Sequence, residues 1–327
     1  MIITRTPFRI SFAGGGSDLP AFYKRASGAV LSTTINKYMY LSIHPYFDPD
    51  SIHVKYSETE LVREASDLQH PILRALVGEM QITGVEITSS GDVPSGTGMG
   101  SSSAFSVGLY HCLSAYSGKF RSKEELAQKA CEIEIEKLLN PIGKQDQYAA
   151  AYGGLNFMQF FPTGEVQVEP VILPRKLLRK IDDNLLLFYT GDVRPAGEIL
   201  EEQTKNLEQS DDRFNSLSTM VSQAFELKSA LESGNIDDFG ALLNEGWKLK
   251  KSLATAISNP RIDHYYELAI TQGGAYGGKL LGAGSGGYLL FYCIPEHQEK
   301  LRQTLSELQE LPFSITRTGS EVIHYDV

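Results

Sequence analysis

A glycine-rich stretch that runs directly into a helical pattern constrains the fold of this chain more than any other segment. Residues 92–104 read DVPSGTGMGSSSA, and apolar side chains then recur at helical spacing from Phe105 to Tyr116. Closely spaced glycines let the backbone adopt left-handed angles, so several N–H groups can point into one concavity. The helix that follows adds the positive end of its dipole. The stretch therefore predicts a loop that binds an anion such as a polyphosphate; the alternative is a flexible glycine–serine linker.

This stretch resembles the phosphate loop of the GHMP kinases, a family that includes galactokinase, homoserine kinase, mevalonate kinase and phosphomevalonate kinase. Met99 is an extra residue that loosens the glycine spacing usual in that family. The resemblance implies that the chain uses ATP as cofactor and that the nucleotide contacts Pro94, Gly96, Gly98, Met99, Gly100, Ser101, Ser102 and Ser103.

The N-terminus is predicted to be a strand, because residues 2–12 alternate between two faces before the turn AGGGSD. An arginine on a strand is usually an exposed edge residue, but Arg9 lies next to this turn. The segment resembles the first motif of the GHMP kinases, which implies that Arg9 is catalytic and that Asp18 binds sugar hydroxyls. Gly15 and Gly16 stand where galactokinase has Glu-His. The resemblance therefore implies a sugar pocket, with Gly15 and Gly16 in it, that differs in detail from that of galactokinase.

The first half of the chain is rich in predicted strands. Residues 28–43, 53–56 and 85–89 contain many β-branched and aromatic residues, and a helix containing residues 70–80 lies between them. Strands followed by a glycine loop and a helix favour an α+β fold over a doubly wound sheet. The resemblance implies two domains: a ribosomal S5 domain 2-like domain over residues 1–180 and a ferredoxin-like domain over residues 181–327.

A helix is predicted from Ser122, where a capping box begins, to about Leu139, where Asn140-Pro141 ends it. Glu134 falls on the apolar stripe of this helix, and a carboxylate on a buried face has to be paired or to bind a cation. The alternative is a glutamate at the edge of the stripe that reaches solvent. The magnesium-binding glutamate of the GHMP kinases lies six residues before an Asn-Pro pair, as Glu134 does, so the resemblance implies an Mg²⁺ site made by Glu134 and Ser102.

The segment GKQDQ after this helix contains Lys144 and Asp146. A carboxylate within reach of an ammonium group can accept a proton from a hydroxyl. Taken alone, Asp146 is more typical of a helix cap. The segment resembles the G-x-x-D-Q element of galactokinases, which implies that Asp146 is the catalytic aspartate.

The second half contains a predicted strand at residues 184–190 and helical stripes over residues 217–231 and 242–253, which we interpret as core packing. A second glycine-rich segment, residues 273–287, leads into a strand at residues 288–294. It resembles the third motif of the GHMP kinases, which implies that it lies beside the phosphate site and helps to close it.

Charge and cysteine usage narrow the functional class. A net charge of −10 at pH 7 argues against a nucleic-acid-binding surface, although a local basic pocket remains compatible with phosphate substrates. The three cysteines (Cys112, Cys131 and Cys293) lie in apolar segments and are predicted to be buried thiols. Arginines interrupt the N-terminus before a signal-peptide core could form, and no apolar run reaches membrane-spanning length. We therefore predict a cytoplasmic protein with no nucleic-acid or membrane partner.

Within the family, the openings TRTPFRISFAGGGSDLPAFY and GAVLSTTINKY resemble the D-glycero-D-manno-heptose 7-phosphate kinases. That resemblance implies phosphorylation of the anomeric hydroxyl of a sugar phosphate, with Lys144 and Arg194 as candidates for binding its second phosphate. The alternatives are a fucokinase-like or galactokinase-like sugar 1-kinase, or a non-catalytic sugar and ATP sensor.

Overall fold

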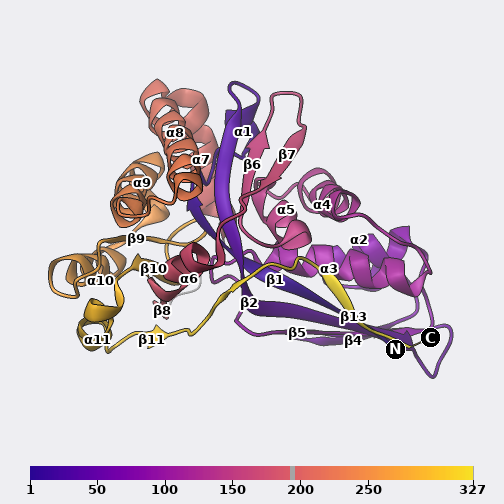
Figure 1. The fold of residues 1–327 in the computed structure, drawn as a ribbon. Coiled ribbons are helices and arrows are strands. Elements are labelled where there is room, and N and C mark those ends of the chain that lie inside the picture. The colour runs from indigo at the N-terminus through magenta and orange to yellow at the C-terminus, as the bar shows by residue number, and fades with distance from the viewer. Residues whose placement is uncertain (192–195, 327) are drawn as a thin grey trace.

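The computed structural model describes residues 1–191 and 196–326, and within them the strands form two sheets. The first sheet has nine strands in these residues, ordered β13-β1-β2-β5-β3-β4, with β6 and β12 also paired to β2 and with β7 paired to β6. Their bounds are β1 (Ile2–Ala13), β2 (Gly28–Pro45), β3 (Ile52–Lys55), β4 (Thr59–Val62), β5 (Val85–Gly91), β6 (Asn156–Phe160), β7 (Val166–Pro170), β12 (Ile315–Thr316) and β13 (Glu321–Tyr325). The pairs are antiparallel except β3 with β5, and the two long strands β1 and β2 reach from one half of the molecule to the other (Figure 1).

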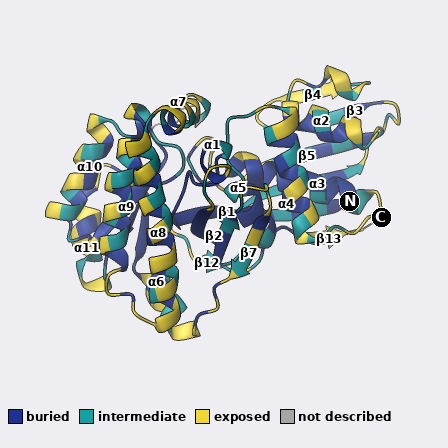
Figure 2. Cartoon of the chain, turned by 90° about the horizontal axis from the view of Figure 1, so that it is seen from above, coloured by how far each residue is buried: buried dark blue, intermediate teal, exposed yellow. Residues whose placement is uncertain are grey.

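Helices cover one face of this sheet, with α3 (Ser101–Tyr116) packed directly on β1 and β2. Close approach is possible because α3 is rich in small residues: a Cβ on Gly108 would lie 2.7 Å from Thr6 Oγ1. The other elements of this half are α1 (Pro20–Tyr23), η1 (Ala65–Asp67), α2 (Pro71–Glu79), α4 (Lys123–Cys131), the π-helix η2 (Glu132–Lys137) and α5 (Gln145–Tyr152). Because α4 and α5 pack on its outer side, α3 is buried around most of its circumference (Figure 2).

The second sheet is antiparallel, in the order β11-β8-β10-β9. Its strands are β8 (Leu185–Tyr189), β9 (Gly277–Leu280), β10 (Tyr288–Tyr292) and β11 (Gln309–Glu310). The helices around it are α6 (Arg175–Asp183), α7 (Ala196–Gln209), α8 (Asp211–Ser233), α9 (Phe239–Leu253), η3 (Thr255–Ile257), α10 (Pro260–Thr271) and α11 (Pro295–Thr304). Helix α8 packs on both α9 and β2, so it joins the two halves of the molecule.

The predicted α+β class is confirmed, since the sheets are almost entirely antiparallel and helices lie to their sides. The capping box is also present: Glu125 N donates to Ser122 Oγ (3.2 Å) and Ser122 N donates to Glu125 Oε2 (2.8 Å). The helix after it continues as predicted but widens into a π-helix at Glu132. A π turn inside a helix is a feature that often occurs at functional sites.

The domain boundary at residue 180 stays a prediction. The chain after residue 311 returns to the first sheet, where β12 pairs with β2 and β13 pairs with β1.

The three cysteines are buried thiols, as predicted. Among the residues that the structure describes, no helix has both the length and the apolar character needed to cross a membrane.

Candidate active site

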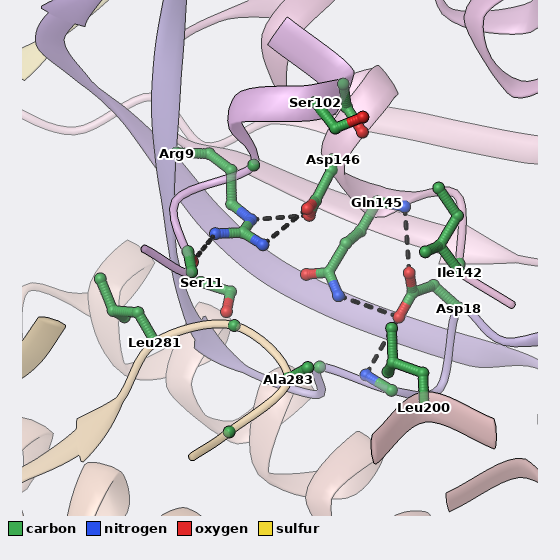
Figure 3. Close-up of a pocket in the computed structure, with 18 of the residues that line it drawn as sticks. Arg9, Ser11, Asp18, Ser102, Ile142, Gln145, Asp146, Leu200, Leu281 and Ala283 are labelled. Atoms are coloured by element: carbon green, nitrogen blue, oxygen red, sulfur yellow. Dashed lines mark hydrogen bonds and ion pairs between the residues drawn. The ribbon is translucent and has the colours of Figure 1, made fainter. Parts of the chain in front are cut away.

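A cavity with a volume of about 230 Å³ lies where the two halves of the molecule meet. Its walls come from β1 and the turn after it, the loop before α3, η2 and the loop after it, and the start of α5 (Figure 3). The other half of the molecule contributes α7, α9, β9 and the loop after β9. Three segments that the sequence singled out, the turn at residues 13–18, the loop at 92–104 and the segment at 273–287, therefore meet around one cavity.

The loop before α3 has the geometry of an anion-binding loop. Gly98 and Gly100 have φ angles of +80° and +73°, and Gly100 is the N-cap residue of α3. Among residues 1–191 and 196–326, no side-chain hydrogen bond caps this helix terminus. A 16-residue helix thus begins at the cavity with a glycine at its N-cap, and such a terminus favours a negatively charged group.

Packing against the later glycine-rich segment holds this loop in place. A Cβ on Gly98 would lie 2.4 Å from the carbonyl oxygen of Leu281, and a Cβ on Gly282 would lie 2.5 Å from Gly98 Cα. The two backbones are therefore in direct contact without side chains between them. This contact accounts for the glycines at both positions and places the loop beside the second sheet.

Gly98→Ala is expected to lower the free energy of unfolding by about 1–3 kcal/mol more than Gly118→Ala does, because overpacking adds to backbone strain. Gly118 is a matched control: its φ is +68°, but nothing lies within 4 Å of the position of a Cβ. Urea unfolding of both variants measures the difference. Equal losses would mean that only the left-handed conformation matters and that the contact between the two loops contributes nothing.

Arg9 and Asp146 form a two-pronged ion pair in the cavity. Arg9 Nε donates to Asp146 Oδ1 at 2.6 Å and Arg9 Nη2 donates to Asp146 Oδ2 at 2.7 Å. Arg9 Nη1 also donates to the carbonyl of Gly98 at 2.6 Å, so the guanidinium connects the carboxylate to the glycine-rich loop (Figure 3). The partner of Asp146 is thus Arg9, from a strand 137 residues away, and not the neighbouring Lys144.

Asp18 lies on another side of the cavity and is almost fully buried. It accepts hydrogen bonds from the N–H groups of Gly16 (3.0 Å) and Gln145 (3.1 Å) and from Gln145 Nε2 (3.0 Å). Burial raises the pKa of its carboxyl group, while these hydrogen bonds oppose the shift. Gln145 Oε1 is buried and has no hydrogen-bond partner among the described residues. Because Gln145 lines the cavity, this oxygen can accept a hydrogen bond from a ligand hydroxyl.

Glu134 is fully buried and lines the same cavity, which confirms the prediction that it lies on a buried face. Its carboxylate accepts hydrogen bonds from Ser102 Oγ (2.9 Å) and Gln147 Nε2 (3.2 Å). Burial raises the pKa of Glu134 to about 7, because the low-polarity surroundings disfavour the charged form. A bound cation would offset that cost, so this carboxylate and Ser102 Oγ offer oxygen ligands of the kind that Mg²⁺ takes.

Some of the predicted site residues lie away from the cavity walls. The carbonyl of Pro94 accepts from Thr97 Oγ1 inside the loop (2.9 Å), and the side chain of Met99 is buried in the core while its carbonyl accepts from Arg9 N (3.2 Å). Lys144 Nζ donates to the carbonyl of Gly164 (2.6 Å). Arg194 lies outside the described residues. The remaining predicted positions all line the cavity: Arg9, Gly15, Gly16, Asp18, Gly96, Gly98, Gly100, Ser101, Ser102, Ser103, Glu134 and Asp146.

Two further lysines line the cavity, Lys250 on α9 and Lys279 on β9. The sequence had not led us to assign either of them to the site. Both are buried, and burial lowers the pKa of Lys250 to about 8 and that of Lys279 to about 7. Lys250 follows Leu243 and Trp247 along the buried stripe of α9. The same signal that singled out Glu134, a charged residue on an apolar stripe, would have found it.

Known proteins match both halves of the chain. The family model "GHMP kinases N terminal domain" matches residues 60–154, and "GHMP kinases C terminal" matches residues 227–312. A D-glycero-alpha-D-manno-heptose 7-phosphate kinase from Campylobacter jejuni is 30% identical over 97% of both chains. A bifunctional fucokinase/GDP-fucose pyrophosphorylase from Arabidopsis thaliana is 28% identical over 94% of this chain and 31% of its own.

Solved structures share the fold. A D-glycero-D-manno-heptose 1-phosphate kinase from Bacteriodes thetaiotaomicron superimposes with a TM-score of 0.81 at 24% identity and covers all of both chains. At that identity the likeness shows the fold alone. With both family models matched and a full-length relative at 30% identity, the chain belongs to the GHMP kinases and is a sugar phosphotransferase.

Proposed function

We propose that this kinase transfers the γ-phosphoryl group of ATP to the anomeric hydroxyl of D-glycero-D-manno-heptose 7-phosphate, giving the 1,7-bisphosphate. The observation that carries the proposal is the match, over 97% of both chains, to a heptose 7-phosphate kinase. The turn at Gly15 and Gly16 is consistent with it, because both glycines line the cavity and their backbone can approach a bound sugar closely. Asp18 and the free oxygen of Gln145 are the groups that would accept hydrogen bonds from ring hydroxyls.

The residues around the cavity divide the remaining tasks. The N–H groups of residues 96–103 would bind the nucleotide phosphates at the start of α3. Asp146 would accept the proton of the acceptor hydroxyl or orient that hydroxyl, and Arg9 would stabilise the charge that spreads over the transferred group. Bound Mg²⁺ would neutralise charge on the β- and γ-phosphates, held by Glu134 and Ser102. The hydrogen bond between Ser102 Oγ and Glu134 supports this assignment, since it already places the two oxygens together.

The substrate proposal is tested by comparing kcat/KM for heptose 7-phosphate, unphosphorylated heptose, L-fucose and D-galactose. We expect heptose 7-phosphate to be preferred by a factor on the order of 10² or more, because a site that pairs with a phosphate leaves polar groups unpaired when the phosphate is missing. A fucokinase-like activity is the second candidate, favoured by the 28% match to the plant fucokinase. A higher kcat/KM for fucose or galactose would show that the heptose assignment is wrong, while the chain would remain a sugar kinase.

A further inference from the structure

The cavity contains two buried ammonium groups that form no ion pair among the described residues. Lys250 Nζ donates to Gln203 Oε1 at 2.8 Å, and Lys279 Nζ donates to the carbonyl of Phe12 at 3.3 Å. Both acceptors are neutral. An ammonium group has three N–H donors, so each lysine keeps donors for another partner. Burying a charge without an ion-pair partner is costly, so an anion that enters the cavity would stabilise the charged form of both lysines.

Gln203 on α7 holds Lys250 from behind, by accepting its hydrogen bond. Its side chain is fully buried, and its Nε2 has no hydrogen-bond partner in the described parts of the chain. The position of a Cβ on Gly16 would be 2.4 Å from Gln203 Nε2 and 3.5 Å from Lys250 Nζ. Both side chains therefore pack against the backbone of Gly16, where only a glycine fits. Gly16 and Lys250 line the cavity, and Gln203 lies behind them.

Lys250 lies near the sugar-binding groups, and Lys279 lies near Lys250. Asp18 is close enough to Lys250 for its charge to favour the ammonium form of that lysine. The nucleotide phosphates have separate candidates for their binding, namely the start of α3, the glycine-rich loop and Arg9. A ligand that contacts both regions would offer hydroxyls near Asp18 and an anion near the lysines, which is the chemistry of a sugar phosphate.

We propose that Lys250 and Lys279 form an anion subsite that binds the phosphate carried by the sugar substrate, and that Gln203 positions Lys250 in it. This inference rests on the proposed function, and it names the residues that would recognise the second phosphate. The lowered pKa values of both lysines agree with it, because a bound phosphate would restore the charged form of each ammonium group. Lys144 is occupied by the carbonyl of Gly164 and lies outside the cavity.

The direct test is binding of D-mannose 6-phosphate and D-mannose, measured by calorimetry on wild type, Lys250→Met and Lys279→Met. We expect wild type to bind the phosphorylated sugar more tightly, and each substitution to reduce that preference by a factor on the order of 10². Lys248→Met is the matched control, because Lys248 is an exposed lysine on the same helix. Gln203→Leu keeps both lysines but removes the oxygen that accepts from Lys250 Nζ, and it tests the subsite separately if a lysine variant fails to fold.

Several results would overturn the subsite. Wild type could show no preference for the phosphorylated sugar, or the lysine variants could keep the full preference, or Lys248→Met could lose it equally. A loss of ATP affinity with an unchanged preference between the two sugars would instead assign the lysines to the nucleotide. Failure of the heptose assignment is read separately, from kcat/KM across the sugars. A kinase that prefers another phosphorylated sugar and loses that preference in Lys250→Met retains the subsite.

Discussion

Asp146→Asn is expected to lower kcat by about 10²- to 10⁴-fold, the range typical of losing a positioned general base, with little change in the Kd for ATP. The reason is that its carboxylate lines the cavity, where it is paired with Arg9. The predicted nucleotide contacts are instead backbone N–H groups of the glycine-rich loop. Single-turnover kinetics measure the chemical step, and a fluorescent ATP analogue measures binding. A turnover close to that of wild type would contradict the assignment of Asp146.

The ion pair makes a second experiment necessary, because removing Asp146 also releases Arg9. A double-mutant cycle with Arg9→Met separates the two effects. If Asp146 acts on the acceptor hydroxyl, the double variant should be slower than Arg9→Met alone. If Asp146 only holds the guanidinium near Gly98, adding Asp146→Asn to Arg9→Met should cost nothing further.

Glu134→Gln is expected to raise the Mg²⁺ concentration for half-maximal rate by roughly 10- to 100-fold, since an amide oxygen carries no charge to attract the ion. Glu136→Gln is the control, because Glu136 is exposed on the same π-helix. A magnesium titration at constant ATP measures the effect. Equal titrations for Glu134→Gln and wild type would leave Glu134 as a structural residue only.

The pH dependence follows from the raised pKa of Glu134, which is about 7 in the folded protein against an ordinary value of 4.5. Below pH 7 a proton competes with the metal, so each pH unit should raise the required Mg²⁺ concentration by about tenfold. In the metal-free protein, a higher pH lowers stability. The folded state holds the proton of Glu134 more tightly than the unfolded state does, so the free energy of unfolding falls as pH rises from 4.5 to 7.

The size of that stability change is about 3 kcal/mol as an upper bound. It is measured as the difference in unfolding free energy between wild type and Glu134→Gln, in EDTA and without nucleotide. The two buried lysines titrate in both proteins, so their contributions cancel in this difference. A difference that does not vary with pH would mean that Glu134 titrates normally.

Local chemistry allowed much of the fold to be predicted from the sequence. The loop before α3, the capping box at Ser122 and the burial of Glu134 follow from glycine content, hydrogen-bonding side chains and helical periodicity, which act over a few residues. The α+β class followed from the order of strands and helices. The resemblance to the GHMP kinases, carried by three motifs, was confirmed by the comparisons.

Tertiary structure alone decided which side chains meet. Arg9 pairs with Asp146 across 137 positions because β1 passes the start of α5, while the adjacent Lys144 turns to Gly164. Lys250 and Lys279 come together because α9 packs against β9, and neither element indicates the other in the sequence. Such pairings depend on how distant elements pack. Periodicity and turn chemistry depend only on residues that are close in the sequence. They therefore determine the helices and strands of this protein, but not the partners of its charged groups.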